Sequence, residues 1–329
     1  MNKNYFKKAC AFIMCGTIIF NLNTSTSFAA PEITELSLNT QETVEITDYN
    51  LETQIEGKSY VKDFILPTNY AQDDETSPYV IIGNDNRTIV SDTTVAPYRY
   101  IGRLVIYASS SKTGKAAKFS GTGFLVGPKL VMTAAHCLYP TDDDGVIYDK
   151  VTEAIFYPGR NGNSTPYGSA KGTVLHVPTK YKDSAPTYNK KYDYAVMELN
   201  TAIGNTTGSF STDANYIVGT EGVINPLNVT LAGGGAFNSL KVTLAGYPGN
   251  ETQNNKLYKH SGTASFENDD YIFSYTIDTE GGQSGSPLYL KQNGKFCVVG
   301  IHILGNSAAK QNYGRRITNA ILQLVNKYN

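Results

Sequence analysis

The feature of this chain that most limits its fold is the dense series of short β-type segments that begins near residue 80. From there onward the sequence is rich in Tyr, Val, Ile, Thr and Gly, and turn residues interrupt the apolar runs at close intervals. Segments of this length and composition predict an all-β fold. The strongest strand candidates are YIGRLVIYASS, GTGFLVGPKLVMTAA, GTVLHVP, YDYAVMEL, LKVTLAGYPG, YIFSYTI, SPLYL and FCVVGIHI.

One segment, ITNAILQLVNKYN at the end of the sequence, departs from the β-type pattern. Its apolar residues recur at spacings of three and four, at Ile317, Ile321, Leu324, Val325 and Tyr328. Because this spacing places them on one face of a helix, we predict a helix over residues 317–328. Its apolar face should pack on the last strands.

The first 29 residues have the layout of a secretory signal peptide. Three lysines within the first eight residues precede the largely apolar run ACAFIMCGTIIF, and small residues follow it. The apolar run is too short for a transmembrane helix and is interrupted by Gly16 and Thr17. We therefore predict that residues 1–29 are a signal peptide, that the protein is secreted, and that it carries no membrane anchor.

Charge divides the rest of the chain into two parts. Residues 30–79 contain eleven acidic side chains and two lysines, a net charge of −9, whereas residues 80–329 carry +5. The acidic part is either a disordered linker or a propeptide that covers a basic mature domain and acts as its intramolecular partner before activation. A surplus of +5 spread over the second part, without a Lys/Arg cluster, does not predict nucleic-acid binding.

Two cysteines, Cys137 and Cys297, remain after removal of the predicted signal peptide. An oxidising compartment would allow a disulfide between them. Their positions in the sequence do not establish that they are close in space, so their pairing stays open.

The stretch GGQSGSP, residues 281–287, places three glycines around Ser284, as in a tight turn or around an exposed nucleophile. A serine hydroxyl becomes a good nucleophile only when a base accepts its proton. His136 is the candidate base, because it follows an apolar run at an expected strand end. Asp193, at the start of another apolar strand, is the candidate carboxylate that orients the imidazole. His176 in GTVLHVP is expected on a strand surface.

The motifs TAAHC, DYAVMEL and GGQSGSP, in this order, resemble those of the chymotrypsin-like serine proteases. More narrowly, IIGNDNRTIV, FYPGRNGNSTPYGS, AGYPGN, KHSG and DTEGGQSGSP resemble the secreted bacterial glutamyl endopeptidases of Bacillus and Staphylococcus, over nearly all of residues 80–329. The resemblance implies two packed six-stranded antiparallel β-barrels, which we place at residues 80–205 and 206–329, and a C-terminal α-helix. The stretch 213–240 is longer than in that family.

The resemblance also implies the roles of individual residues. Ser284 would be the nucleophile, His136 the general base and then acid, and Asp193 the orienting carboxylate. The backbone N–H groups of Gly282 and Ser284 would form the oxyanion hole. The resemblance further implies a monomer that acts on protein or peptide substrates, without a metal or cofactor, and that starts near Val80 after removal of the propeptide.

Specificity for Glu before the cleaved bond, and more weakly for Asp, is implied through Thr279 and His302. Asp278 argues for a trypsin-like alternative, because a carboxylate six residues before Ser284 would attract Lys or Arg if it faced the pocket. A second alternative is a catalytically idle protease fold that serves as a secreted binding module. An intact set of His136, Asp193 and Ser284 favours the enzyme.

Overall fold

The computed structural model describes residues 41–64 and 80–329, except for 143, 185–188, 213–217, 220–221, 224–238, 250–254, 266–270 and 293. The predicted signal peptide and most of the stretch 213–240 therefore lie outside the described residues. Ser37–Asn329 forms one compact unit, to which all of the described residues belong.

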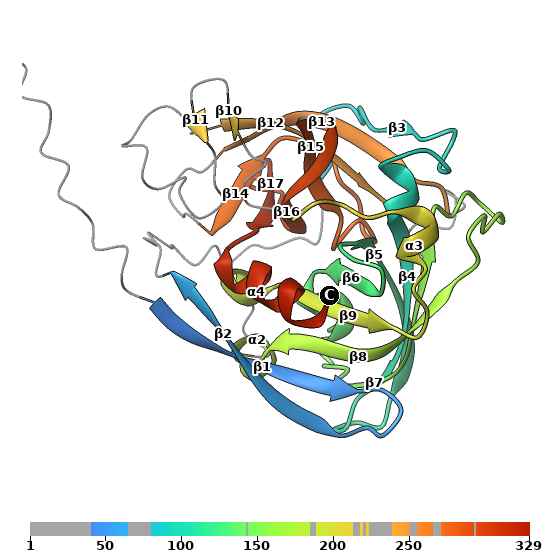
Figure 1. Ribbon diagram of the computed structural model, residues 1–329, viewed down its shortest axis with the longest axis vertical. Coiled ribbons are helices and arrows are strands. Elements are labelled where there is room, and N and C mark those ends of the chain that lie inside the picture. Colours follow the sequence, from blue (N-terminus) through green and yellow to red (C-terminus); the bar gives the residue numbers. More distant parts are fainter. Residues whose placement is uncertain are drawn as a thin grey trace, which may run out of the picture. The chain divides into compact units, whose positions relative to one another are not determined.

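Six antiparallel strands between residues 101 and 199 close into a barrel (Figure 1). Their order is β8-β7-β4-β5-β6-β9, and a pairing between β8 and β9 closes the barrel. Apolar side chains alternate along the strands and fill the interior, as expected for sheets with one buried face. The strands are β4 (Ile101–Ser109), β5 (Ala116–Leu125), β6 (Leu130–Thr133), β7 (Lys150–Pro158), β8 (Ala170–Pro178) and β9 (Ala195–Leu199).

A second set of six antiparallel strands forms another closed barrel, in the order β12-β15-β16-β17-β14-β13 with a β12–β13 closure. Its strands are β12 (Ser239–Gly246), β13 (Tyr258–Ser265), β14 (Ile272–Tyr275), β15 (Pro287–Gln292), β16 (Lys295–Asn306) and β17 (Gln311–Arg316). Short strand β3 (Thr88–Ile89) pairs with β13, and β10 (Val218–Gly219) pairs with β11 (Gly222–Val223). The prediction of two six-stranded antiparallel barrels is confirmed.

Helix α4 (Asn319–Tyr328) confirms the predicted C-terminal helix. It packs chiefly against the strand Glu56–Phe64 near the start of the described chain, and also against β9 of the first barrel. Its buried apolar residues share a hydrophobic cluster with Ile301 and Ile303 of β16, so packing near the last strands is one part of a wider contact. The remaining helices are single turns: α1 (Ala135–Leu138), α2 (Thr179–Asp183), α3 (Gly204–Thr207) and the 3₁₀ turns Tyr98–Tyr100 and Lys190–Tyr192. None of the helices in the described chain is long and apolar enough to cross a bilayer.

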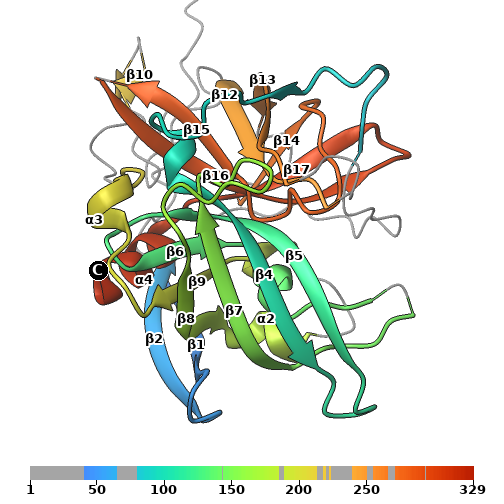
Figure 2. The same cartoon turned by 90° about the vertical axis from the view of Figure 1, so that its right-hand side faces the viewer.

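Part of the acidic segment is a β-hairpin of β1 (Gln41–Asn50) and β2 (Glu56–Phe64), which corrects the disordered-linker interpretation for residues 41–64. Strand β1 joins the first barrel by pairing antiparallel with β8, and β2 lies beside α4 (Figure 2). Val44 and Ile46 alternate with polar residues and are buried. This alternation is what a strand with one apolar face requires.

Candidate active site

Pairing of β6 with β9 brings His136 and Asp193 together across 57 residues of sequence. His136 lies in the single turn α1 after β6, and the completely buried Asp193 precedes β9. His136 Nδ1 lies 2.8 Å from Asp193 Oδ2, and the His136 backbone N–H donates to Asp193 Oδ1 over 2.9 Å. The carboxylate thus holds both the ring and the backbone of the histidine.

This pair determines the protonation of the imidazole. A carboxylate accepts hydrogen bonds, so Nδ1 of His136 carries the proton and Nε2 is directed away from Asp193. Burial opposes the charged form of the ring, but the charge and hydrogen bond of Asp193, together with the interaction with Cys137, outweigh burial and raise the pKa of His136 well above the ordinary 6.5. A ring in this tautomer can accept a proton at Nε2.

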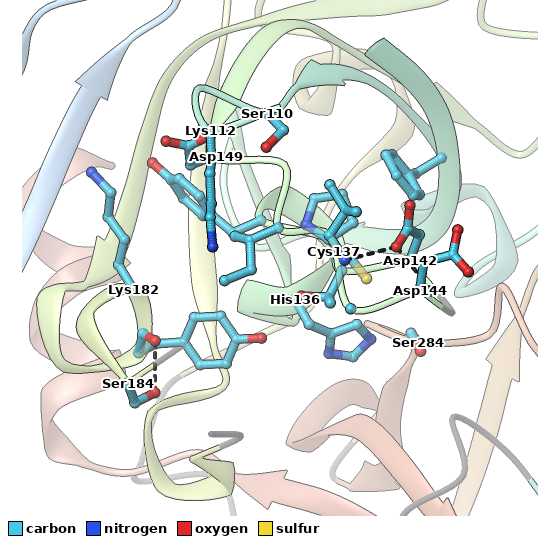
Figure 3. Close-up of a pocket in the computed structure, with 18 of the residues that line it drawn as sticks. Ser110, Lys112, His136, Cys137, Asp142, Asp144, Asp149, Lys182, Ser184 and Ser284 are labelled. Carbon is cyan, nitrogen blue, oxygen red and sulfur yellow. Dashed lines mark hydrogen bonds between the residues drawn. The ribbon is translucent and has the colours of Figure 1, made fainter. Parts of the chain in front are cut away.

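His136 and Ser284 line the same open cavity of about 1070 Å³, and Figure 3 shows the two side chains next to each other. Gly281, Gly282 and Leu304 line the cavity as well. His136 and Ser284, which are far apart in the sequence and were expected to act together, therefore line one cavity. A serine and a histidine in one cavity form an arrangement that is suited to proton transfer from a hydroxyl to an imidazole.

The loop around Ser284 needs two of its glycines for steric reasons. Gly282 has a φ of 90° and Gly285 a φ of 82°, which side chains of L-residues rarely tolerate. A Cβ on Gly282 would stand 2.3 Å from the backbone N of Gly249, and one on Gly285 2.2 Å from the carbonyl O of Thr122. The glycines thus allow the backbone of the loop to lie directly against neighbouring backbone.

Hydrogen bonds on both sides hold the Ser284 loop in place. The Thr122 N–H donates to the Ser284 carbonyl over 2.9 Å, and the Gly285 N–H donates to the His302 carbonyl over 2.8 Å. Within the described residues, the N–H groups of Gly282 and Ser284 donate to no protein acceptor. Two backbone donors thus remain available beside the Ser284 hydroxyl.

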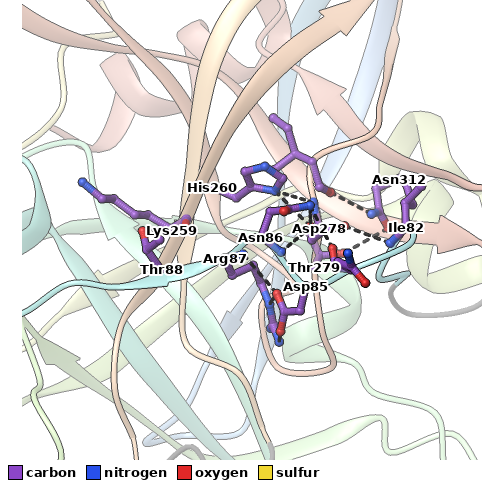
Figure 4. A network of polar contacts seen from close by, with 12 residues as sticks. Ile82, Asp85, Asn86, Arg87, Thr88, Lys259, His260, Asp278, Thr279 and Asn312 are labelled. Carbon is purple, nitrogen blue, oxygen red and sulfur yellow. Dashed lines mark hydrogen bonds and ion pairs between the residues drawn. The ribbon is translucent and has the colours of Figure 1, made fainter.

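The side chains of Arg87 and Gln283 hold the Ser284 loop in place through hydrogen bonds, and Figure 4 shows Arg87 among its polar neighbours. Neither residue was identified as a site residue from the sequence. The buried Arg87 guanidinium donates to Gln283 Oε1 over 2.9 Å and pairs with Glu280 over 2.8 Å. Gln283 Oε1 also accepts the Glu280 N–H, at 2.9 Å. The residue before the serine is thereby tied to the segment that follows Val80.

Asp278 does not line the cavity and is only 1% exposed. Its carboxylate accepts the N–H groups of Ile82, at 2.8 Å, and Asn86, at 2.9 Å (Figure 4). His260 accepts the Asp278 N–H at Nδ1. The trypsin-like alternative requires the Asp278 carboxylate to face a substrate side chain, but this carboxylate is hydrogen-bonded to backbone N–H groups of the protein itself.

His302 is completely buried on β16, and a hydrogen bond of 2.7 Å joins its Nδ1 to the Tyr275 hydroxyl. The Tyr275 hydroxyl also donates to the Tyr313 carbonyl, at 2.9 Å. His302 Nε2 has no hydrogen-bond partner in the described part of the protein. Burial lowers the pKa of His302 to about 3, so the ring is neutral at about pH 7.

Thr279 is also completely buried and, like His302, does not line the cavity. Its hydroxyl donates to Asn312 Oδ1 over 2.9 Å. The same oxygen accepts the Val80 N–H at 3.0 Å, and Asn312 Nδ2 donates to the Val80 carbonyl at 2.8 Å. Asn312 was missed because a polar residue in QNYGRR gives no sign of complete burial.

The structure also answers two open points of the sequence analysis, the environment of His176 and the pairing of Cys137. His176 is 1% exposed, so its assignment to a strand surface is wrong. Cys137 is a free thiol, so in the described chain it is not joined to Cys297. No group of three or more His, Cys, Asp or Glu among the described residues is arranged to hold a metal ion.

Sequence comparison relates the chain to proteases. Residues 97–327 match the family model described as Trypsin. The chain is 35% identical to the glutamyl endopeptidase of Bacillus licheniformis over 256 residues, which cover 74% of this chain and 68% of that protein. It is 34% identical to the "Extracellular metalloprotease" of Bacillus subtilis over 254 residues, 75% of this chain and 69% of that one.

Comparison with solved structures also relates the chain to proteases. A structure of Glu endopeptidase in complex with MPD superposes with a TM-score of 0.56 at 30% identity, over 75% of this chain and 98% of its own. The protease Anisep from Arthrobacter nicotinovorans, 21% identical, shares the fold with a TM-score of 0.53, over 74% of this chain and 98% of its own. Since the family match extends through both barrels, the chain is a peptide-bond hydrolase and belongs to the trypsin family of chymotrypsin-like serine proteases.

Proposed function

We propose that the protein is a secreted serine endopeptidase that cleaves peptide bonds after Glu, and more slowly after Asp, through His136, Asp193 and Ser284. The observation that carries the proposal is the 2.8 Å contact between His136 and Asp193 in the cavity that Ser284 also lines. The identity to the glutamyl endopeptidase of Bacillus licheniformis supports the specificity.

In the proposed reaction, Ser284 Oγ attacks the substrate carbonyl carbon while His136 Nε2 takes the hydroxyl proton. The N–H groups of Gly282 and Ser284 stabilise the negative oxygen of the tetrahedral intermediate. His136 then returns the proton to the leaving amine, and the C–N bond breaks to leave an acyl-enzyme. Water then attacks the acyl carbon while His136 Nε2 takes one of its protons. The bond between the acyl carbon and Ser284 Oγ breaks, His136 gives the proton to Oγ, and the acid product leaves.

Recognition of Glu is assigned to His302 and Thr279. A substrate carboxylate needs donors that replace its water. The Tyr275 hydroxyl has one proton, and its oxygen lies within hydrogen-bond distance of both the Tyr313 carbonyl and His302 Nδ1. The neutral His302 ring supplies Nε2–H to the substrate only when that proton moves from the Tyr313 carbonyl to Nδ1, and Nε2 has no other partner among the described residues. The engagement of Asp278 by Ile82 and Asn86 weighs against the trypsin-like alternative.

The acid limb of the pH–rate profile should report His136. The general base must be neutral, so kcat/KM rises as the pH rises through the pKa of His136. Because the Asp193 charge raises this pKa, we expect the midpoint of the limb above 6.5. Measurement of kcat/KM on a Glu peptide between about pH 5 and pH 9 checks this. A midpoint below 6.5 would contradict the structural assignment.

We expect the precursor to be cut between Tyr79 and Val80, after a signal peptide has been removed. The charge changes from −9 to +5 at this point, and Val80 is held by Asn312 beside Thr279. The cut would place an α-ammonium group where Val80 now has an amide N–H, near the proposed carboxylate site. N-terminal sequencing of active secreted protein tests this, and a start near residue 30 would refute it.

Replacement of Arg87 by Ala should lower kcat by about ten- to 100-fold with a smaller change in KM, because Gln283 loses the donor that positions the Ser284 loop. Replacement of the exposed Lys115 by Ala is the control and should change neither constant. Thermal unfolding of both variants, measured in parallel, shows whether folding is affected. An Arg87→Ala protein with normal kcat would remove the positioning role.

A further inference from the structure

The β1–β2 hairpin uses a part of the first barrel that the barrel itself leaves unpaired. Strand β1 pairs with the end of β8, from Ile46 opposite Pro178 to Asn50 opposite Val174. Strand β7 pairs with β8 only near its start, at Lys171 and Ala170. The hairpin therefore supplies backbone partners that no strand of the barrel offers to this edge.

The hairpin also contributes to the hydrophobic interior. Val44, Ile46 and Val61 are at most 4% exposed and belong to the same cluster as apolar residues of α4 such as Ile321 and Leu324. Removal of side chains of this kind from water contributes about 1.5–3 kcal/mol each. Without the hairpin, the part of α4 that packs against β2 would be open to solvent.

Asp63 of β2 holds the beginning of α4. Its buried carboxylate accepts the Thr318 hydroxyl at 2.8 Å and the Ala320 N–H at 3.2 Å. It also lies 3.7 Å from the guanidinium of Arg315, which is itself 1% exposed. A helix end needs acceptors for its first N–H groups, and here a different segment of the chain provides one.

His176 joins the hairpin to the barrel. Its Nδ1 donates to Asp48 of β1 over 2.6 Å and its Nε2 donates to Glu198 of β9 over 2.9 Å. The ring stacks on Tyr328 of α4 at 3.7 Å between centroids, and the Tyr328 hydroxyl contacts Ser59 of β2. Burial opposes the charge on His176, but the hydrogen bonds to the two carboxylates outweigh it and raise its pKa. A charged ring thus bridges the two segments.

The remaining charges across this contact are complementary. Glu42 lies 2.6 Å from Lys191, and Glu56 pairs with Lys182. The hairpin contributes no residue to the lining of the cavity that contains His136 and Ser284. Its one link to that lining is through Lys182, which lines the cavity and pairs with Glu56. The contact therefore has the features of a specific interface that leaves His136 and Ser284 uncovered.

We propose that β8 and α4 form a docking site for the β1–β2 hairpin, and that the hairpin stays bound there as a separate subunit after the chain is cut between Tyr79 and Val80. The cut itself is part of the proposed function. The docking is independent of it, because the contacts involve residues 41–64 and none of the catalytic residues. Release of the hairpin would then require a step after the cut.

The test uses the full precursor with Ser284→Ala, in which the segment just before Val80 is replaced by the recognition sequence of an unrelated, highly specific protease. The folded protein is cut to completion and passed over a size-exclusion column at micromolar concentration, and the fractions are analysed by mass spectrometry. We expect both fragments in one equimolar peak. Separate elution of the two fragments overturns the proposal. Neither result depends on catalytic activity, so a failure here is distinct from a failure of the proposed function.

Variants within the hairpin test the contacts and leave the rest of the protein unchanged. Asp63→Ala and the milder Asp48→Asn should each speed exchange of the bound hairpin with excess labelled hairpin peptide by about tenfold or more. Glu52→Gln removes an exposed carboxylate in the hairpin turn and should leave the rate unchanged. Exchange that is equally fast in all variants and in the parent would contradict the docking site.

Discussion

Replacement of Ser284 by Ala is expected to lower kcat for peptide hydrolysis by about 10⁶-fold. The variant loses the hydroxyl that attacks the substrate in the proposed mechanism, while a single small side chain changes in the loop that lines the cavity. His136→Ala should cost a similar factor, and the double variant little more, because residues that act as a unit have non-additive effects. Steady-state rates on a Glu peptide, with thermal unfolding as the check on folding, measure this.

Labelling with a serine-directed active-site reagent completes the test. We expect the parent protein, after removal of its propeptide, to be labelled at Ser284 alone. Ser284→Ala should remain unlabelled. A folded parent that is neither labelled nor active would instead support the binding-module alternative. Rates near those of the parent in either single variant would contradict the assignment of His136 and Ser284.

The second large effect concerns specificity. His302→Ala should lower kcat/KM on a Glu peptide by about ten- to 100-fold, because a hydrogen bond from the enzyme to a charged group contributes about 1.5–3 kcal/mol. The matched Gln peptide should lose much less, since it gains less from this donor. The measurement compares Glu, Asp, Gln, Lys and Phe peptides that differ only before the cleaved bond.

The substrate series is its own control, because damage to the fold lowers all rates together. An equal loss on every peptide would make His302 a structural residue. A preference of the parent for Lys would revive the trypsin-like alternative. That outcome would require Asp278 to leave the N–H groups of Ile82 and Asn86, which now hold it.

Some features of the protein could be predicted because their cause is local in sequence. The all-β class follows from strand-length apolar runs separated by turn residues, and α4 follows from a helical spacing of apolar residues. The division into two barrels was implied only by the resemblance to a known family. The glycines at 282 and 285 indicated an unusual backbone, and both have positive φ. In each case the residues that define the pattern are neighbours in the element that they form.

Other features could not be predicted because their partners are distant in sequence. Strand β17 has the polar sequence QNYGRR, yet Asn312, Arg315 and Arg316 are at most 2% exposed. Arg315 is satisfied by Lys191, Thr318 and Asp63, in three different segments. No local pattern distinguishes such a strand from an exposed loop.

The sequence by itself determined the all-β class, the C-terminal helix and the set of candidate catalytic residues, because backbone periodicity and short motifs are encoded by adjacent residues. Only the tertiary structure decided that Asp278 faces the chain rather than the cavity, that His176 is buried between two carboxylates, and that an acidic segment is a hairpin. The physical reason is the same for all three. A charged side chain is placed by the groups that replace its water, and here those groups come from segments up to 280 residues away.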